Sequence, residues 1–330
     1  VGFIKPVGQR YVLVEDEQID EDSFLLHRVC NLNCALKDLS PIAIPKGFTR
    51  HYIEHPEQHE QLVARILQAY QKSARDKDLV VIEGTGHAGV GSVFGLSNAR
   101  VAALLDAKVI IVTCGGIGRP VDEIAINCSL FESEGVDVIG VIANKVLPDK
   151  LDQTRYYLSK VLDTRQLPLL GVIPYRERLA WPTVMEIAEK IPAEVLHGTE
   201  ALGNEIAHTV IGAMTPHNAL TYLRDNTLMI VPGDRDDVVL AAVSMHLLRE
   251  DLTVAGIVLT GGLKLAAQTM DLVSRTNIPM LAVKHATSEA ASLIHDIRVK
   301  IHVTDTEKIR LANALIHEYV DVEKIWHALQ

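Results

Sequence analysis

The chain has 330 residues, a length that favours two domains over one. Hydrophobic residues make up 48% of it and aromatic residues only 5%, which is typical of an α/β core whose strands are buried on both faces. The net charge of -10, with basic residues that occur singly, excludes an electrostatic attraction to nucleic acid or to acidic membranes. Four cysteines make no disulfide framework, and neither a signal peptide nor a membrane-length apolar stretch is visible, so we expect a cytoplasmic protein.

Short β-branched runs alternate with amphipathic segments of helical length over the first 190 residues. The expected strands are 1–5, 79–83, 109–113, 136–142 and 169–173. The expected helices include 60–74, 97–105, 121–132 and 151–162. This alternation predicts right-handed crossovers and a doubly wound parallel sheet.

A second strand–helix series follows a break in the pattern. Residues 191–207 contain Pro192, Gly198 and Gly203 and no clear strand, so we place a boundary there and expect domains of 1–195 and 205–330. The expected strands of the second, smaller α/β domain are 208–211, 227–231, 254–259, 280–283 and 300–303. A final helix is expected from 306 to about 327.

The loops after the first two strands carry the residues of most chemical interest. In open parallel sheets, ligands bind beyond the carboxyl ends of the strands. Lys5 lies there and can contact a phosphate. The alternative is that Lys5 is a surface lysine before a turn that Pro6 imposes. Glu83 ends the next strand, where P-loop proteins hold Mg²⁺ or its water, and Gly84 and Gly86 let the backbone approach phosphate. The alternative for this second loop is a capped turn with a solvated glutamate.

Two later loops add polar groups at the same edge. Asn144, followed by Lys145, is placed where a side-chain amide can read the edge of a purine ring, and Pro174 forms a turn after the fifth strand. Each loop is ambiguous alone. Because all of them follow consecutive strands of one expected sheet, we expect them to converge on one crevice.

The order and spacing of these motifs resemble a known family. The motifs are Lys-Pro-Val (5–7), Glu-Asp-Ser-Phe-Leu-Leu (21–26), Val-Ile-Glu-Gly-Thr-Gly (81–86), Ala-Asn-Lys (143–145) and Leu-Gly-Val-Ile-Pro-Tyr (170–175). They resemble dethiobiotin synthetase and cobyrinic acid a,c-diamide synthetase. The likeness is greatest to the dethiobiotin synthetase-like N-terminal domain of some bacterial phosphate acetyltransferases, and it covers residues 1 to about 190.

The resemblance implies ligands and roles for particular residues. It implies binding of ATP, or another purine nucleotide, with Mg²⁺ assisted by Asp22 and Glu83. Lys5 would contact the phosphates or the substrate as the catalytic lysine, and Asn144 with the Pro174 turn would hold the base.

One departure from the family concerns the phosphate loop. Nothing in the sequence matches GxxxxGK[ST], and the chain opens at what would be the family's second strand. Either roughly thirty preceding residues are absent here, or this family member lacks the loop. We expect the first, because a parallel sheet that loses its central first strand would expose two buried edges. Without that loop, triphosphate binding should be weak.

The second domain resembles the DRTGG domain. Its altered motif is read at 232–237, Pro-Gly-Asp-Arg-Asp-Asp, and at 259–262, Leu-Thr-Gly-Gly, each after a strand. Plain tight turns would explain these glycines equally well. The resemblance implies a nucleotide-sensing or regulatory module that self-associates.

Two functions are consistent with these features. The first is a nucleotide-binding regulatory or sensor protein whose partner is a small-molecule nucleotide. The alternative is an ATP- and Mg²⁺-dependent ligase that activates a carboxylate or carbamate through a phosphoryl intermediate, with a weak ATPase as a variant. The loop from Gly84 to Gly95 contains His87 and Ser92 and differs from that of dethiobiotin synthetase, which argues against the same substrate. The fusion to a DRTGG-like domain favours regulation. Acetyl transfer is not expected of this chain by itself.

Overall fold

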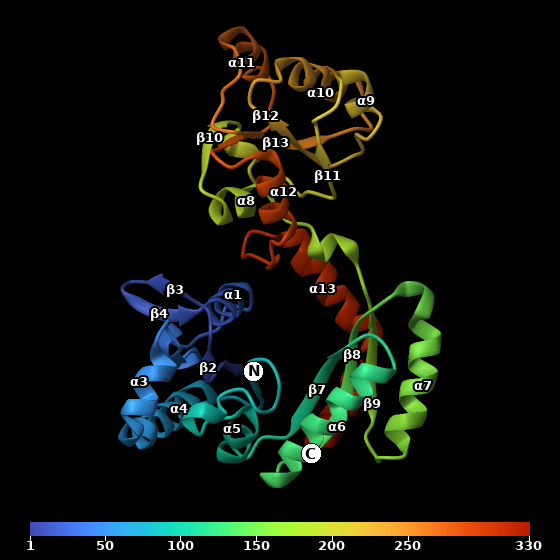
Figure 1. Cartoon of the computed structure of the whole chain (residues 1–330). Helices are drawn as coiled ribbons and strands as arrows, with labels where there is room; N and C mark the ends of the chain where they lie inside the picture. The colour runs from blue at the N-terminus through green and yellow to red at the C-terminus, as the bar shows by residue number, and fades with distance from the viewer. The chain divides into compact units, whose positions relative to one another are not determined.

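The computed structural model describes residues 1–330 and divides into two compact units (Figure 1). The first unit comprises Val1–Tyr175 and His302–Gln330, and the second comprises Arg176–Ile301. The chain therefore passes from the first unit into the second and returns to the first unit at His302. The expected second domain ran from 205 to the end of the chain, whereas the structure places its last 29 residues, His302–Gln330, in the first unit.

The first half of the first unit is built around a short parallel pair of strands. Gly2 pairs with Val80 and Ile4 with Ile82, and helix α4 packs on this pair. The elements are β1 (Gly2–Ile4), β2 (Val7–Gly8), β3 (Tyr11–Val14), β4 (Glu17–Asp20), α1 (Glu21–Val29), α2 (Leu36–Leu39), β5 (Ile42–Ala43), α3 (Phe48–Glu54), α4 (His59–Ala74), β6 (Val80–Ile82) and α5 (Asn98–Leu104). The apolar stripe of α4, which includes Leu62 and Ile66, is buried in the core of this half.

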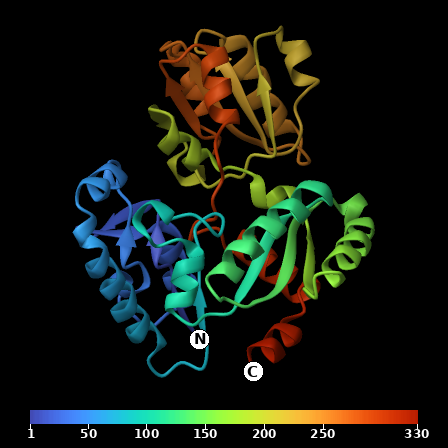
Figure 2. The same ribbon diagram turned by 60° about the horizontal axis from the view of Figure 1, so that its bottom comes forward.

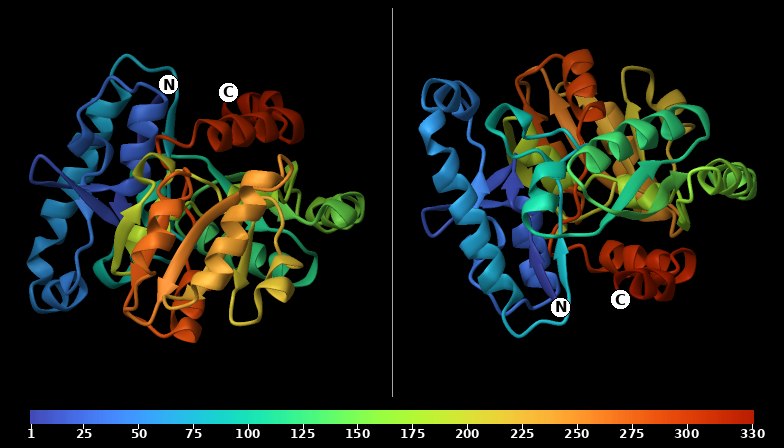
Figure 3. Two further views of the ribbon diagram at one scale, coloured as in Figure 1. Left: turned by 90° about the horizontal axis from the view of Figure 1, so that it is seen from above. Right: turned by 90° about the horizontal axis from the view of Figure 1, so that it is seen from below.

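A separate parallel sheet of order β7-β8-β9 forms the second half of this unit. Its elements are β7 (Val109–Cys114), α6 (Gly118–Ser133), β8 (Val138–Val146), α7 (Leu151–Asp163) and β9 (Leu169–Pro174), with α13 (Thr306–Tyr319) and α14 (Val322–Leu329) from the end of the chain. Figures 2 and 3 show α6 and α7 on one face of this sheet and the two C-terminal helices on the other. β8 and β9 are thus covered on both faces, as their continuous apolar runs predict, whereas Val112 and Cys114 of β7 are exposed.

Close backbone approach fixes the C-terminal helices against β9. A Cβ on Gly171 would lie only 2.7 Å from the carbonyl oxygen of Tyr319. The backbone N–H of Asp321 donates to the carbonyl of Leu170 at 2.8 Å, and the Asp321 side chain caps α14. The single expected helix from 306 to about 327 is therefore two helices that meet at this contact.

The second unit is a five-stranded sheet of order β10-β14-β13-β12-β11. Its elements are α8 (Val184–Lys190), β10 (Ala193–His197), β11 (His208–Ile211), α9 (Pro216–Leu220), β12 (Thr227–Pro232), α10 (Asp236–Leu248), β13 (Val254–Thr260), α11 (Ala267–Val273), β14 (Met280–Val283) and α12 (Thr287–His295). Alternate residues of β12 enter two different cores: Met229 packs with α10, and Leu228 with α8 and α12.

Most expected elements are confirmed, and three differences are informative. The two halves of the first unit carry separate sheets, β1-β6 and β7-β8-β9, where one sheet was expected. The segment 191–207, expected to lack a strand, contains β10, which pairs antiparallel with β14 at the sheet edge. The expected strand 300–303 is wrong: these residues are irregular, and Val303 is 37% exposed. No helix of the structure combines the length and the apolar character that crossing a membrane requires.

Candidate functional site

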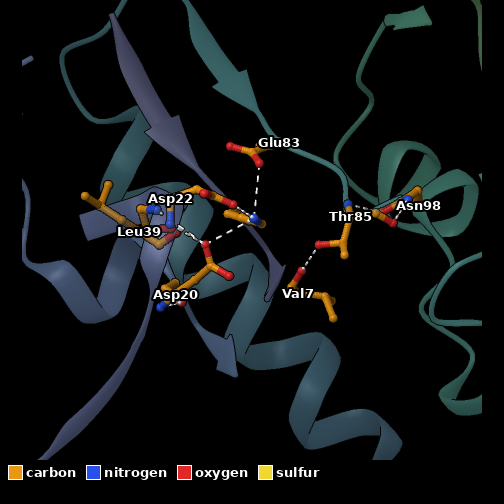
Figure 4. A network of polar contacts seen from close by, with 10 residues as sticks. Val7, Asp20, Asp22, Leu39, Glu83, Thr85 and Asn98 are labelled. Atoms are coloured by element: carbon orange, nitrogen blue, oxygen red, sulfur yellow. Dashed lines mark hydrogen bonds and ion pairs between the residues drawn. The ribbon is translucent and has the colours of Figure 1, made fainter. Parts of the chain in front are cut away.

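Lys5 lies at the centre of a cluster of carboxylates at the carboxyl ends of β1 and β6 (Figure 4). Its Nζ lies 3.1 Å from Oδ1 of Asp20 and 3.1 Å from Oε1 of Glu83, and it donates a hydrogen bond to Asp22. The Lys5 side chain is only 6% exposed, and that of Asp20 only 1%. We call these four residues the Lys5 cluster. It brings together the three residues that were expected to act on phosphate and Mg²⁺.

The local backbone explains why the carboxylates converge. Asp20 is the N-cap of α1, and its Oδ1 accepts hydrogen bonds from the backbone N–H groups of Asp22 and Ser23. This cap fixes the first turn of α1 beside Lys5. Gly8 makes room for the Asp20 side chain, because a Cβ on residue 8 would lie 2.4 Å from Oδ2 of Asp20.

Burial and charge act in opposite directions on the two central groups. Burial alone would lower the pKa of Lys5, but the hydrogen bond to Asp22 and the charges of the carboxylates raise it above its ordinary value. Burial raises the pKa of Glu83, although Lys5 opposes this effect. Lys5 is therefore a permanent cation among three carboxylates. When all three are ionised, the cluster keeps an excess of two negative charges.

The glycine loop beside the cluster is held by side-chain amides and a hydroxyl. Nδ2 of Asn98 donates to the carbonyls of Thr85 and His87, each at 2.8 Å, and Oδ1 of Asn98 accepts from the Thr85 backbone N–H at 3.2 Å. The Thr85 hydroxyl donates to the carbonyl of Val7 at 2.6 Å. Gly86 has a left-handed φ of 70°, which favours glycine. The loop that follows Glu83 is thus fixed to both β2 and α5.

The other expected residues lie at the carboxyl edge of the second sheet. Asn144 is paired with Cys114 in the β7–β8 ladder, and Pro174 is opposite Val146 at the ends of β8 and β9. Lys145 has a left-handed φ of 57°, and Oδ1 of Asn144 accepts a hydrogen bond from its backbone N–H. These three residues form a second group at the ends of β8 and β9. Their expected role with the purine base stays a prediction.

The sequence alone missed two members of the site, Asp20 and Asn98. A signal for Asp20 was present: an Asp immediately before a helical run is a preferred N-cap. Nothing local to Asn98 indicated that its amide reaches back to a loop eleven to thirteen residues earlier.

The fold and the site define a P-loop NTPase-like α/β protein joined to a second α/β domain. Residues 1–183 match the model of a family described as the AAA domain, and residues 186–297 match that of the DRTGG domain. The first match covers more than half of the chain, which therefore belongs to this AAA-domain family and carries a DRTGG domain after it. The DRTGG match falls wholly inside the second compact unit.

Two curated proteins similar to this chain are phosphate acetyltransferases. The phosphate acetyltransferase of Nitratidesulfovibrio vulgaris is 28% identical over 98% of this chain and 47% of its own length. The phosphate acetyltransferase of Synechocystis is 29% identical over 82% of this chain and 40% of its own length. The chain thus spans about half the length, or less, of these relatives.

A solved structure shows a weaker likeness. It contains the CBS and DRTGG domains of the regulatory region of Clostridium perfringens pyrophosphatase, complexed with the activator diadenosine tetraphosphate. It is 14% identical, has a TM-score of 0.31 and covers 63% of this chain and 86% of that chain. A likeness of this size supports no detailed comparison.

Proposed function

We propose that this protein is a nucleotide-responsive regulatory module, in which the AAA-domain unit binds a purine nucleotide with Mg²⁺. The observation that carries the proposal is Lys5, held among Asp20, Asp22 and Glu83 at the carboxyl ends of two parallel strands. A lysine ammonium beside carboxylates supplies the charges that phosphate and Mg²⁺ binding require. The glycine loop fixed by Asn98 begins directly after Glu83.

The donor set of the cluster suits Mg²⁺ once Lys5 has moved. Mg²⁺ prefers carboxylate and phosphate oxygens and keeps several waters. No group of three or more His, Cys, Asp or Glu side chains is arranged as a metal site in the structure. The ammonium of Lys5 lies within 3.1 Å of Asp20 and Glu83. Asp22 and Glu83, each about one-third exposed, are the two that a metal can reach from solvent. The phosphates would draw Lys5 toward them and leave the two carboxylates to the cation.

The DRTGG domain supports regulation over catalysis as the role of the bound nucleotide. The expected partner of the protein is a small-molecule nucleotide, and self-association would run through the second unit. The second candidate function is an ATP- and Mg²⁺-dependent ligase. The same Lys5 cluster supports it, since phosphoryl transfer needs positioning and charge more than acid–base groups.

Calorimetry tests the nucleotide proposal. ATP with Mg²⁺ should bind this chain, with an affinity that falls when Mg²⁺ is removed. Glu83→Gln should weaken the Mg²⁺-dependent part of the affinity at least tenfold. Glu57→Gln is the matched control, because Glu57 is 69% exposed and pairs only with His55. An absence of ATP or GTP binding to this chain at high micromolar concentration, or an affinity that Glu83→Gln leaves unchanged, would overturn the proposal. Turnover of ATP only in the presence of a carboxylate or amine substrate would favour the ligase.

A further inference from the structure

The three carboxylates of the Lys5 cluster are held in different ways. Asp20, Asp22 and Glu83 converge from β4, from the first turn of α1 and from the end of β6 (Figure 4). Oδ1 of Asp20 is committed to the backbone, because it accepts from the N–H groups of Asp22 at 3.0 Å and Ser23 at 3.4 Å. The Asp20 side chain is almost fully buried, whereas Asp22 and Glu83 each keep about a third of the side chain exposed. One carboxylate is therefore part of the fold, and two can be reached by a ligand.

The ammonium of Lys5 lies where a metal cation would have to lie. Its Nζ is 3.1 Å from Oδ1 of Asp20 and 3.1 Å from Oε1 of Glu83, and it donates to Oδ2 of Asp22. Mg²⁺ needs its oxygen ligands at about 2.0–2.1 Å. Two cations cannot both contact the same oxygens, because they repel each other strongly in a site that is shielded from water. A metal that binds Asp22 and Glu83 must therefore displace the ammonium from both.

The charge of the cluster opposes either ligand alone. With the three carboxylates ionised and Lys5 protonated, the cluster carries an excess of two negative charges. This excess repels a free phosphate anion, and the ammonium repels a free divalent cation. A metal–phosphate complex meets neither obstacle, because its oxygens attract the ammonium while its metal binds the two carboxylates that the ammonium leaves. The flexible four-carbon stem of lysine permits this exchange without movement of the backbone.

We propose that Lys5 holds the cation position of the site, so that a divalent cation enters only together with a phosphate-bearing ligand that takes over the ammonium. Lys5 is then the specificity-determining residue, which selects a metal–phosphate complex over the metal or the phosphate alone. The inference rests on the proposed function, because it concerns the same site and narrows its ligand class to metal-complexed phosphates.

Asp20 is the positioning residue for this exchange. Its carboxylate is buried and fixed by the helix cap, so it stays with Lys5 when Asp22 and Glu83 turn to the metal. Leaving that buried charge without its cation would be costly, which limits how far the ammonium can move. Gly8 packs against the other oxygen, since a Cβ on residue 8 would lie 2.4 Å from Oδ2 of Asp20. The ammonium therefore swings about Asp20 and does not leave the site.

Mn²⁺ is the probe for the metal, because the electron paramagnetic resonance of free Mn²⁺ reports its binding without any nucleotide. Three affinities are measured for the 330-residue chain: for Mn²⁺ alone, for ATP in EDTA, and for the equimolar Mn²⁺–ATP complex, the last two by calorimetry. The wild-type chain should bind the complex at least about tenfold more tightly than either component. Lys5→Met should bind Mn²⁺ alone at least about tenfold more tightly than wild type and should lose the preference for the complex.

A double variant separates the vacated cation position from net charge, and it keeps the test valid if Lys5→Met alone does not fold. Lys5→Met combined with Asp20→Asn removes both charges of the most buried pair, so the two remaining carboxylates carry the same two excess negative charges as the wild-type cluster. Asn caps a helix as well as Asp does, so α1 keeps its cap. Tighter binding of Mn²⁺ alone by this variant would come from the absent ammonium. Lys72→Met is the control, because Lys72 is exposed and pairs with Asp38, and its three affinities should equal those of wild type.

Asp20→Asn by itself tests the positioning role. It should lower the affinity for the Mn²⁺–ATP complex about fivefold or more and leave the binding of Mn²⁺ alone as weak as in wild type, since the ammonium is still present. Added to Lys5→Met, the same change should leave the affinity for the complex within about twofold, because the group that Asp20 positions is gone. A merely structural role would lower the affinity in both backgrounds and would overturn the assignment of Asp20.

Two results would overturn the role of Lys5. One is equal affinity of wild type, Lys5→Met and the double variant for Mn²⁺ alone, and the other is a wild-type chain that binds Mn²⁺ alone as tightly as the complex. Inorganic tripolyphosphate in place of ATP separates this failure from that of the proposed function. A chain that prefers the Mn²⁺–tripolyphosphate complex to its components but does not bind ATP upholds the role of Lys5 and refutes the purine ligand. A chain without preference for either complex overturns the inference itself.

Discussion

Replacing Lys5 by methionine should destabilise the first unit by about 3 kcal/mol at pH 7. The substitution keeps the length of the side chain and removes its charge, which leaves the almost fully buried carboxylate of Asp20 without its cation. Removal of one partner from a buried ion pair costs about 3–5 kcal/mol. The pairs with Asp22 and Glu83 add little, because these side chains are 33% and 36% exposed and water screens them. We therefore take the lower end of the range, roughly a hundredfold change in the equilibrium between folded and unfolded unit.

The penalty should depend on pH with a definite sign. Burial raises the pKa of Glu83 and Lys5 opposes this, so Lys5→Met should raise it further. A carboxyl group whose pKa is higher in the folded state favours folding below its unfolded pKa, about 4.3, and that contribution is lost as pH rises through the folded pKa. The part of the Lys5→Met penalty that Glu83 contributes should thus be smallest near pH 4 and reach its full size by pH 7, so the total should shrink modestly toward pH 4.

Pulsed hydrogen exchange across a urea series measures the free energy of unfolding of the first unit by itself. Peptides that contain β1 and β6 report the unfolding of the first unit separately from the second. Lys72→Met is the matched control: Lys72 is 51% exposed, pairs with Asp38 at 2.8 Å and should cost less than about 1 kcal/mol. A loss no larger than that of the control, or one that does not shrink toward pH 4, would refute the role given to Lys5.

Three further predictions concern packing, the glycine loop and a thiol. Gly171→Ala should loosen α13 and α14, because the new Cβ would lie 2.7 Å from the last carbonyl oxygen of α13. Limited proteolysis should then cut these two helices at least tenfold faster. Gly118→Ala is the control: Gly118 has open space around it, so the cleavage rate should not change. Asn98→Ala removes three hydrogen bonds and should cost about 2 kcal/mol, seen as faster hydrogen exchange in the 84–88 loop but not in β8. Burial raises the pKa of the Cys128 thiol, so iodoacetamide at pH 8 should alkylate the exposed Cys114 first; equal rates would contradict the burial.

The sequence predicted the fold class well because buried parallel strands are continuous apolar runs. The runs at 109–113 and 169–173 became β7 and β9 almost residue for residue. Edge strands are harder to predict, since their outer side faces solvent and their apolar pattern is weak. β10 was missed for this reason: Glu194 and Val195 are exposed within it.

The placement of long-range partners could not be predicted from local patterns. The sequence of an amphipathic helix shows which of its faces is buried but not which sheet it packs on. α13 was therefore expected in the second domain, whereas it lies in the first unit. The Lys5 cluster was predicted in part, because Lys5 and Glu83 follow strands, where parallel sheets bind ligands. Asp20 comes close to Lys5 and Glu83 only because β3 and β4 form a hairpin and because Gly8 leaves room for its side chain. Residue spacing in the sequence predicts neither contact.

The return of the chain to its first unit has a practical consequence for cutting the gene. The second unit is an insertion between β9 and α13, so a stop codon placed at the end of the AAA-domain match, after residue 183, would also delete the helices that cover one face of β7-β8-β9. That truncated product should expose apolar strand surface and aggregate. A minimal first unit is obtained by excision instead, with residues 1–175 spliced through a short polar linker to residues 302–330.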